Sequence, residues 1–263
     1  MQFMNKTIVL LSIVSLGVVS CSKEVKAPEA TSEVSQEAKD KIFALGYTST
    51  GAQKIEEGYL VEGDIVLTEN DLNSTSVNHF LRIGGEEQYR TNNLVTGLPR
   101  VITVSISDQL PASYVAALDE ALGRYNAQNL LITFQRVSSG ADISMVKAGG
   151  NYLASAGFPS GGEPYGQVKV NNRAIGNQPQ STVATIMAHE LGHCIGFRHT
   201  DYMNRAYSCG GAASNEGASS VGAVLIPGTP SGPDPNSWML ACIGSGQNRP
   251  FNNNDRTALN YLY

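Results

Sequence analysis

The apolar and polar positions along the chain change pattern at Val101, where a series of predicted strands and helices begins. Residues 101–107 (VITVSIS) are typical of a β-strand, and residues 111–127 carry apolar side chains at helical spacing behind a first-turn proline, Pro111. The second segment therefore predicts a helix that packs on a sheet. Further strands are predicted at residues 130–137, 141–146, 152–157 at the sheet edge, and 166–171.

A second long helix is predicted from Ser181, a natural N-cap, to about residue 195. The glycine-, serine- and proline-rich residues 207–237 that follow predict a long surface excursion with a short strand at 224–226. Residues 254–263 predict a terminal helix capped by Asn254 or Asp255. Before Val101 the patterns are shorter: a helix is predicted at 37–45, residues 59–67 are apolar with an acidic interruption, and residues 84–97 are polar and irregular.

Composition and charge narrow the class of protein. The 263 residues allow one or two domains. A formal net charge of −5 argues against a nucleic-acid partner. The 16% charged residues and 27 glycines are typical of an exported, loop-rich globular protein.

The first residues have the pattern of an export signal. Lys6 precedes an uncharged apolar run at residues 7–20 that is too short for a comfortable membrane span. The following V-V-S-C sequence resembles a bacterial lipobox, which predicts cleavage before Cys21 and a lipid anchor on its thiol; an ordinary signal peptide with an incidental Cys21 is the alternative. The protein is then expected outside the cytoplasm, held at the outer membrane or cell surface or secreted after processing. Residues 22–40 predict a polar tether.

Three cysteines remain after Cys21, and in an oxidising compartment they permit one disulfide and one free thiol. We prefer a Cys209–Cys242 pair because Cys194 lies inside the second long helix. The other pairings stay open.

One stretch, HELGHCIGFRH, contains three of the four histidines of the chain. On a helix, His189 and His193 project from the same face one turn apart, so both can reach one Zn²⁺. Gly196 can end the helix with a sharp turn, after which His199 can return as third ligand. Three protein ligands leave the fourth position open, as in a catalytic zinc site. Glu190 is then placed to take a proton from a metal-activated water.

The string H-E-x-x-H-x-x-G-x-x-H is the metzincin signature, and the chain resembles these zinc metallopeptidases. The resemblance implies an α/β zincin fold, with a twisted mixed sheet, a backing helix and a zinc-site helix, then a smaller C-terminal subdomain with a methionine turn and a terminal helix. Met239 is the expected turn methionine, since Met203 follows the motif too closely. Thr200 and Ala241 stand where astacin-type enzymes have Glu and Tyr.

Cys194 within the motif, the FRHTD run and the C-terminal NDRTALNYLY look most like the bacterial dual-action HEIGH metallopeptidases. This resemblance implies a monomeric zinc endopeptidase that hydrolyses proteins or peptides with Glu190 as general base and acid. The alternative is a non-catalytic binding lipoprotein on a peptidase scaffold. His79, outside the motif, is expected to be a surface histidine.

The chain is accordingly divided into a signal peptide (1–20), lipidated Cys21 with a tether (21–40), a prosegment (41–97) and a catalytic domain (98–263). The sequence V-E-G-D-I at 61–65 resembles the zinc-binding element of astacin-type prosegments, with Val61 in place of its Phe. Asp64 is therefore either the switch that keeps the precursor latent, or an ordinary turn acid between two strand segments. If it is the switch, activation is expected to cut between Arg90 and Leu98.

Overall fold

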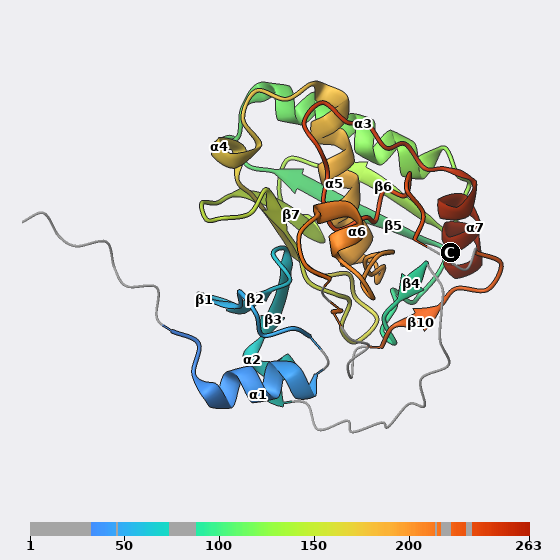
Figure 1. Cartoon of the computed structure of the whole chain (residues 1–263). Helices are drawn as coiled ribbons and strands as arrows, with labels where there is room; N and C mark the ends of the chain where they lie inside the picture. Colours follow the sequence, from blue (N-terminus) through green and yellow to red (C-terminus); the bar gives the residue numbers. More distant parts are fainter. Residues whose placement is uncertain (1–32, 46, 74–87, 214, 217–221, 230–232) are drawn as a thin grey trace, which may run out of the picture. The chain divides into compact units, whose positions relative to one another are not determined.

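The computed structural model describes residues 33–45, 47–73, 88–213, 215–216, 222–229 and 233–263 (Figure 1). The signal peptide, Cys21 and His79 lie outside these residues. Among the described helices, none is long and apolar enough to cross a membrane.

A five-stranded mixed sheet forms the centre of the larger part of the protein, in the order β6-β5-β7-β9-β8. The first four of these strands are parallel, and β8 runs antiparallel to β9 at the edge. The alternation of apolar residues in β5 buries Ile102 and Val104 while Val101 faces outward. The sheet strands are β5 Arg100–Ile106, β6 Ile132–Arg136, β7 Ile143–Lys147, β8 Ala154–Ser155 and β9 Gln167–Val170.

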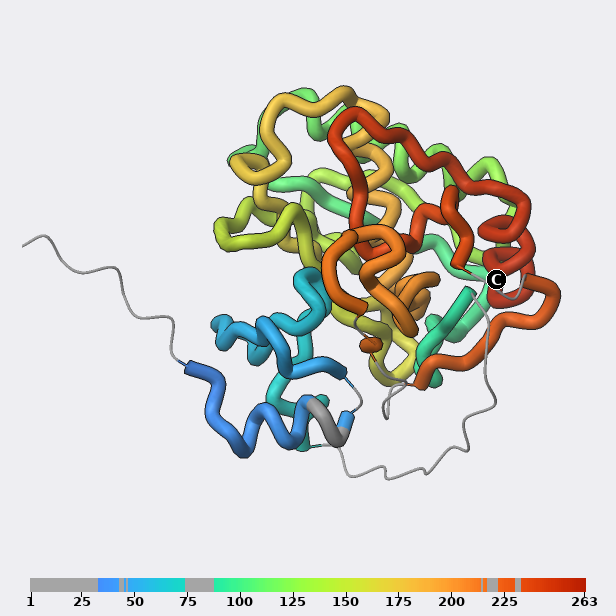
Figure 2. Tube along the Cα trace, viewed as in Figure 1, coloured from blue at the N-terminus to red at the C-terminus, as the bar shows by residue number. Residues whose placement is uncertain are grey.

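The two long helices, α3 (Ala112–Asn126) and α5 (Gln180–Cys194), pack against each other beside this sheet (Figures 1 and 2). Their apolar faces share one core with the sheet and with the terminal helix α7 (Asn253–Leu262). The Tyr125 hydroxyl donates a hydrogen bond of 2.7 Å to the Ala188 carbonyl, which ties α3 to the middle of α5. The predicted mixed α/β fold, with a backing helix and a site helix, is confirmed.

The predicted helix starts were wrong by one or two residues. Ser181 lies in the first turn of α5, because Pro179 occupies the cap position with its φ already fixed at −54°. Pro111 likewise caps α3 from outside instead of standing in its first turn. In α7 the cap is Asn252, whose side chain accepts from the backbone N–H groups of Asn254 and Asp255.

The N-terminal part has a small hydrophobic core of its own. A three-stranded antiparallel sheet of β1 (Gln53–Ile55), β2 (Gly58–Val61) and β3 (Ile65–Thr68) packs beside helices α1 (Gln36–Ala44) and α2 (Glu69–Asn73). Residues 59–67, read as one interrupted apolar segment, are thus the β2–β3 hairpin with a turn at residues 62–64. The buried members of this core are Val34, Ala38, Ile42, Leu45, Tyr47, Val61, Ile65, Leu67 and Leu72.

The predicted boundary at residue 98 does not coincide with a structural boundary. Strand β4 (Tyr89–Arg90) pairs with β10 (Val224–Leu225), and the Thr91 N–H donates to the Gly196 carbonyl at 2.8 Å. The buried side chain of Gln88 donates to Asp255 at 2.7 Å. Residues 88–97 therefore belong to the larger part of the protein, and a cut between Arg90 and Leu98 would separate strand β4, which pairs with β10, from the residues that follow it.

A disulfide joins Cys209, at the end of the short helix α6 (Ala206–Cys209), to Cys242, and Cys194 is a buried free thiol in α5. Another short helix, α4 (Asn172–Ile175), precedes α5. The disulfide holds the excursion after the histidine motif against the segment that follows Met239.

Asp255 gives stability a dependence on pH. Burial raises the pKa of this carboxyl group to about 7 from an ordinary value of 3.8. Its protonated form thus favours the folded chain, and this contribution is complete below pH 3.8 and lost as the pH rises to about 7. We expect the free energy of unfolding of the wild type, relative to Asp255→Asn, to fall by up to about 4 kcal/mol over this range.

Urea unfolding of both full-length proteins at a series of pH values measures this difference, and groups common to both proteins cancel in it. Parallel pH curves for wild type and variant would contradict the prediction.

Candidate metal centre

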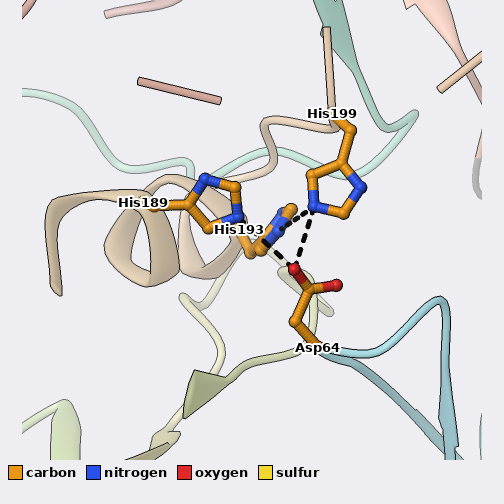
Figure 3. A group of neighbouring side chains, drawn as sticks. All are labelled: Asp64, His189, His193 and His199. Carbon is orange, nitrogen blue, oxygen red and sulfur yellow. Dashed lines mark hydrogen bonds and ion pairs between the residues drawn. The ribbon is translucent and has the colours of Figure 1, made fainter. Parts of the chain in front are cut away.

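Helix α5 and the turn after it bring three buried imidazoles to one point (Figure 3). His189 and His193 stand one helical turn apart on α5. Gly196 then adopts a φ of 106°, and a Cβ there would lie 2.9 Å from the Asn93 carbonyl oxygen, so the turn requires glycine. After this turn His199 returns, and its Nε2 lies 3.2 Å from the Nε2 of His193.

The Nδ1 atom of each imidazole has a partner that can only accept a proton. His189 Nδ1 donates to the Trp238 carbonyl and His193 Nδ1 to the Phe197 carbonyl, both at 2.8 Å. His199 Nδ1 faces the Glu216 carboxylate at 3.1 and 3.2 Å. With Nδ1 protonated in each ring, the three Nε2 lone pairs all face inward. This is the tautomer that metal-ligating histidines adopt.

The tip of the β2–β3 hairpin reaches the same point. Asp64 Oδ2 lies 3.1 Å from His199 Nε2 and 3.6 Å from His189 Nε2 (Figure 3). Ligand atoms of Asp64 and the three histidines all lie within 4.8 Å of one another. Asp64 is thus a turn acid, as one of the two sequence interpretations expects, and this turn carries it to the histidines.

Backbone pairing places the hairpin along the edge of the larger sheet. Ile65 bridges Ala156, just beyond strand β8, in parallel orientation. The Ala156 N–H donates to the Asp64 carbonyl and the Val66 N–H donates to the Ala156 carbonyl, both at 2.9 Å. The hairpin therefore occupies the backbone N–H and carbonyl groups of Ala156, which could otherwise pair with an extended peptide.

The electrostatics of the site favour a cation. Burial lowers the pKa of His199, but the carboxylates of Asp64 and Glu216 on its two sides outweigh burial and raise it well above the ordinary value. Burial lowers the pKa of His193, further depressed by the neighbouring histidines. Burial also raises the pKa of Asp64, but the three histidines outweigh it and hold it well below its usual range. The negative charge of Asp64 and Glu216 therefore attracts a proton or a metal ion to the Nε2 lone pairs of the histidines.

Glu190 faces a cavity beside the histidines. The cavity has a volume of about 280 Å³ and is also bounded by Tyr152, Ile186, Trp238 and Ile243. Glu190 is buried, and its Oε2 atom has no hydrogen-bond partner within the described residues. Burial, with the nearby charge of Asp64, raises the pKa of Glu190 well above its usual range. A buried carboxylate without a protein partner is placed to contact a bound molecule.

Met239 lies against helix α5. A Cβ at Gly192 would lie 2.5 Å from Met239 Sδ, so this glycine, between the first two histidines, makes room for the sulfur. The Met239 carbonyl accepts from the Thr200 N–H at 2.9 Å, which holds the segment next to His199. Met203, the other methionine after the motif, is partly exposed in a turn.

Sequence reasoning missed Glu216. It is fully buried within the glycine- and serine-rich excursion, and its backbone N–H donates to the Tyr202 carbonyl at 2.7 Å. The excursion has no periodic pattern, so the one signal in the sequence was an acid with no other charged residue between Arg205 and Asp234. The donor set as a whole, three imidazoles with oriented Nδ1 groups and a carboxylate, fits a zinc ion.

Comparison with known proteins agrees with this site. The family model of the dual-action HEIGH metallo-peptidases matches residues 59–263. The chain therefore belongs to this family. Among proteins with curated descriptions, none matches the sequence.

Two solved structures are among those similar to the chain. Myroilysin is 20% identical over 42% of this chain and 54% of its own, with a TM-score of 0.32. High choriolytic enzyme 1, a hatching enzyme zinc-protease from the medaka fish Oryzias latipes, is 19% identical over 62% of this chain and 88% of its own, with a TM-score of 0.38. The chain thus spans about half the length of myroilysin.

The metal site leads to a prediction for Glu216. Glu216→Gln in the full-length chain keeps the shape of the side chain but weakens the acceptor for His199 Nδ1, so zinc affinity should fall about 10- to 100-fold. Replacement of His199 by Ala should remove most of the bound metal. Competition with a chromophoric chelator and elemental analysis measure both effects.

Glu163→Gln, a change of an exposed carboxylate, is the matched control and should leave the affinity unchanged. Full zinc occupancy in His199→Ala would exclude the three-histidine site.

Proposed function

We propose that this metallopeptidase is the precursor of an exported zinc endopeptidase, with His189, His193 and His199 as metal ligands. The observation that carries the proposal is the convergence of three Nε2 atoms, each with its Nδ1 fixed by an acceptor, beside Glu190, whose Oε2 has no hydrogen-bond partner in the described part of the chain. When bound, zinc supplies a Lewis acid that polarises the scissile carbonyl and activates water.

The residues of the chain supply the proton transfer and the positioning. Glu190 accepts the proton of the attacking water and delivers it to the leaving amine, as a carboxylate with a raised pKa can do. The edge at Ala156 pairs with an extended peptide substrate once the hairpin has left. The cavity beside Glu190, which is mostly apolar, receives a substrate side chain. Met239 packs beneath the histidines as the methionine turn.

The alternative is a non-catalytic binding lipoprotein on the same scaffold. The position of Glu190 argues against it, because an unpartnered buried carboxylate costs stability that a binding scaffold has no reason to retain. The pairing of the β2–β3 hairpin with the sheet edge at Ala156 is equally compatible with a peptidase and with a binding protein.

Glu190→Gln separates the two functions. The variant should keep its fold and its zinc, yet lose at least 10²–10⁴-fold in the rate of cleavage of a denatured protein, since general acid–base assistance contributes about that much. The assay compares proteolytically activated wild type and variant, with and without a chelator. Wild-type rates in Glu190→Gln, or no chelator-sensitive cleavage by wild type, would contradict the mechanism.

Latency is the second part of the proposal. Asp64 stands among the histidines with one carboxylate oxygen facing them, in the position where a fourth ligand would bind. The hairpin also occupies the substrate edge, and Glu57 at its base pairs with Lys169 of β9. Together these contacts keep substrate and metal apart until the prosegment leaves.

Asp64→Ala should therefore be active without processing, or should activate itself faster than wild type. Glu56→Ala, a change of an exposed acid on the same segment, is the matched control and should stay latent. The measurements are the cleavage rate of the intact precursors and the N-terminus of each activated product, which should precede Gln88. An Asp64→Ala precursor as silent as wild type would mean that the segment inhibits by covering the edge alone.

Export and anchoring complete the proposal. The run before Cys21 supports a signal peptide with a lipidated cysteine, so the precursor would be tethered to a membrane and act on protein or peptide substrates as a monomer. Cys21→Ser should release the protein from the membrane fraction. Unchanged fractionation, with no lipid mass on Cys21, would favour an ordinary signal peptide.

A further inference from the structure

Arg198, the residue before the third histidine, is fully buried. Its guanidinium lies between two aromatic rings, with centroids 5.1 Å away for Tyr47 and 5.4 Å away for Tyr202. Its Nη2 lies 3.7 Å from Glu62 Oε2, and its Nη1 donates to the Gly222 carbonyl at 3.4 Å. A buried guanidinium needs such an enclosure, because an uncompensated charge in the interior is costly.

The enclosure comes from two parts of the chain. Tyr47 and Glu62 belong to the N-terminal core around the β2–β3 hairpin, whereas Tyr202 and Gly222 belong to the larger part of the protein. On the proposed function, on which this inference rests, activation removes the first pair and leaves the second. The guanidinium then keeps one aromatic neighbour and opens on the side where Glu62 stood.

The hairpin supplies one of the two carboxylates that pair with arginines near this point. Ligand atoms of Glu62, Glu216 and His199 lie within 4.8 Å of one another, and Arg205 Nη1 lies 3.5 Å from Glu216. With Glu62 in place, two carboxylates face two guanidinium groups. Removal of the hairpin would take the Glu62 carboxylate away from Arg198 and leave Glu216 paired with Arg205.

Glu62 also occupies a position that a substrate residue can take. It is two residues from Asp64, the residue that faces the histidines, and its backbone adopts a left-handed φ of 57° that turns it toward Arg198. A non-glycine residue in this conformation is strained, and here the strain accompanies the contact between carboxylate and guanidinium. The planar guanidinium suits a carboxylate better than any other side-chain anion receptor.

We propose that Arg198 is a substrate-binding residue of the mature enzyme that accepts the carboxylate of an acidic side chain close to the scissile bond. Glu62 is the occupant of this subsite in the precursor, and an acidic residue of the substrate replaces it after activation. The enzyme then prefers peptides with Glu near the cleaved bond to the same peptides with Gln.

The test uses the activated wild-type enzyme and pairs of fluorogenic peptides in which Glu or Gln occupies each position on either side of the scissile bond in turn. At one position kcat/KM should be roughly tenfold higher for Glu than for Gln, the size of one charge-assisted hydrogen bond. Equal rates within every pair would overturn this inference while leaving the peptidase intact. Absence of chelator-sensitive cleavage of any peptide would instead refute the proposed function.

Two substitutions of Arg198 test whether this residue causes the preference for Glu over Gln. Arg198→Gln should lower the Glu-to-Gln ratio of kcat/KM to about one, and Arg198→Lys, which keeps the charge, should retain part of it. Arg173→Gln, a change of an exposed arginine, is the control and should keep the wild-type ratio. A wild-type ratio in folded, zinc-loaded Arg198→Gln would overturn the assignment. If Arg198→Gln does not fold, the wild-type peptide pairs and Arg198→Lys still decide the matter.

Discussion

The structure depends on the hydrogen bonds that fix the Nδ1 side of three buried imidazoles. Two of the acceptors are backbone carbonyls, Phe197 in the turn itself and Trp238 in the segment that carries Met239. The third is the carboxylate of Glu216. Each acceptor must be held by its own fold element, and this explains why α5, the turn at Gly196, the excursion and the Met239 segment all meet at one point. Loss of any acceptor would free a ring to rotate and would turn an inward lone pair away from the centre.

The hairpin of the N-terminal part satisfies the same groups that a metal and a substrate would satisfy. Asp64 compensates the inward-facing imidazoles, residues 64–66 pair with the edge at Ala156, and Glu62 faces Arg198. Each of these contacts alone would contribute only a modest binding free energy to a peptide in water. These contacts are linked because one short turn presents both acids.

The sequence was informative where chemistry depends on local spacing. The interval between His189, His193 and His199 follows from helix geometry and one glycine, and the strand and helix order of residues 101–195 follows from apolar periodicity. The sequence was uninformative where two hydrogen-bonding residues lie far apart in the chain. Glu216 is an acid in an aperiodic segment, and Gln88 was assigned to the prosegment because nothing local records its bond to Asp255. The start of α5 was shifted because Pro179, not the expected Ser181, stands at the cap, and α7 is capped by Asn252 instead of Asn254 or Asp255.

The register of the β2–β3 hairpin links these observations. Val61 pairs with Ile65, which leaves three residues, 62–64, in the tip and sends Glu62 and Asp64 toward different partners. A shift of one residue would turn the apolar side chains of the strands out of their core and carry Asp64 away from the histidines. The small N-terminal core, with Val61, Ile65 and Leu67 buried, therefore does more than stabilise a separate fold element. It fixes the register in which an acid meets the metal site, so the stability of that core sets how firmly the site is closed.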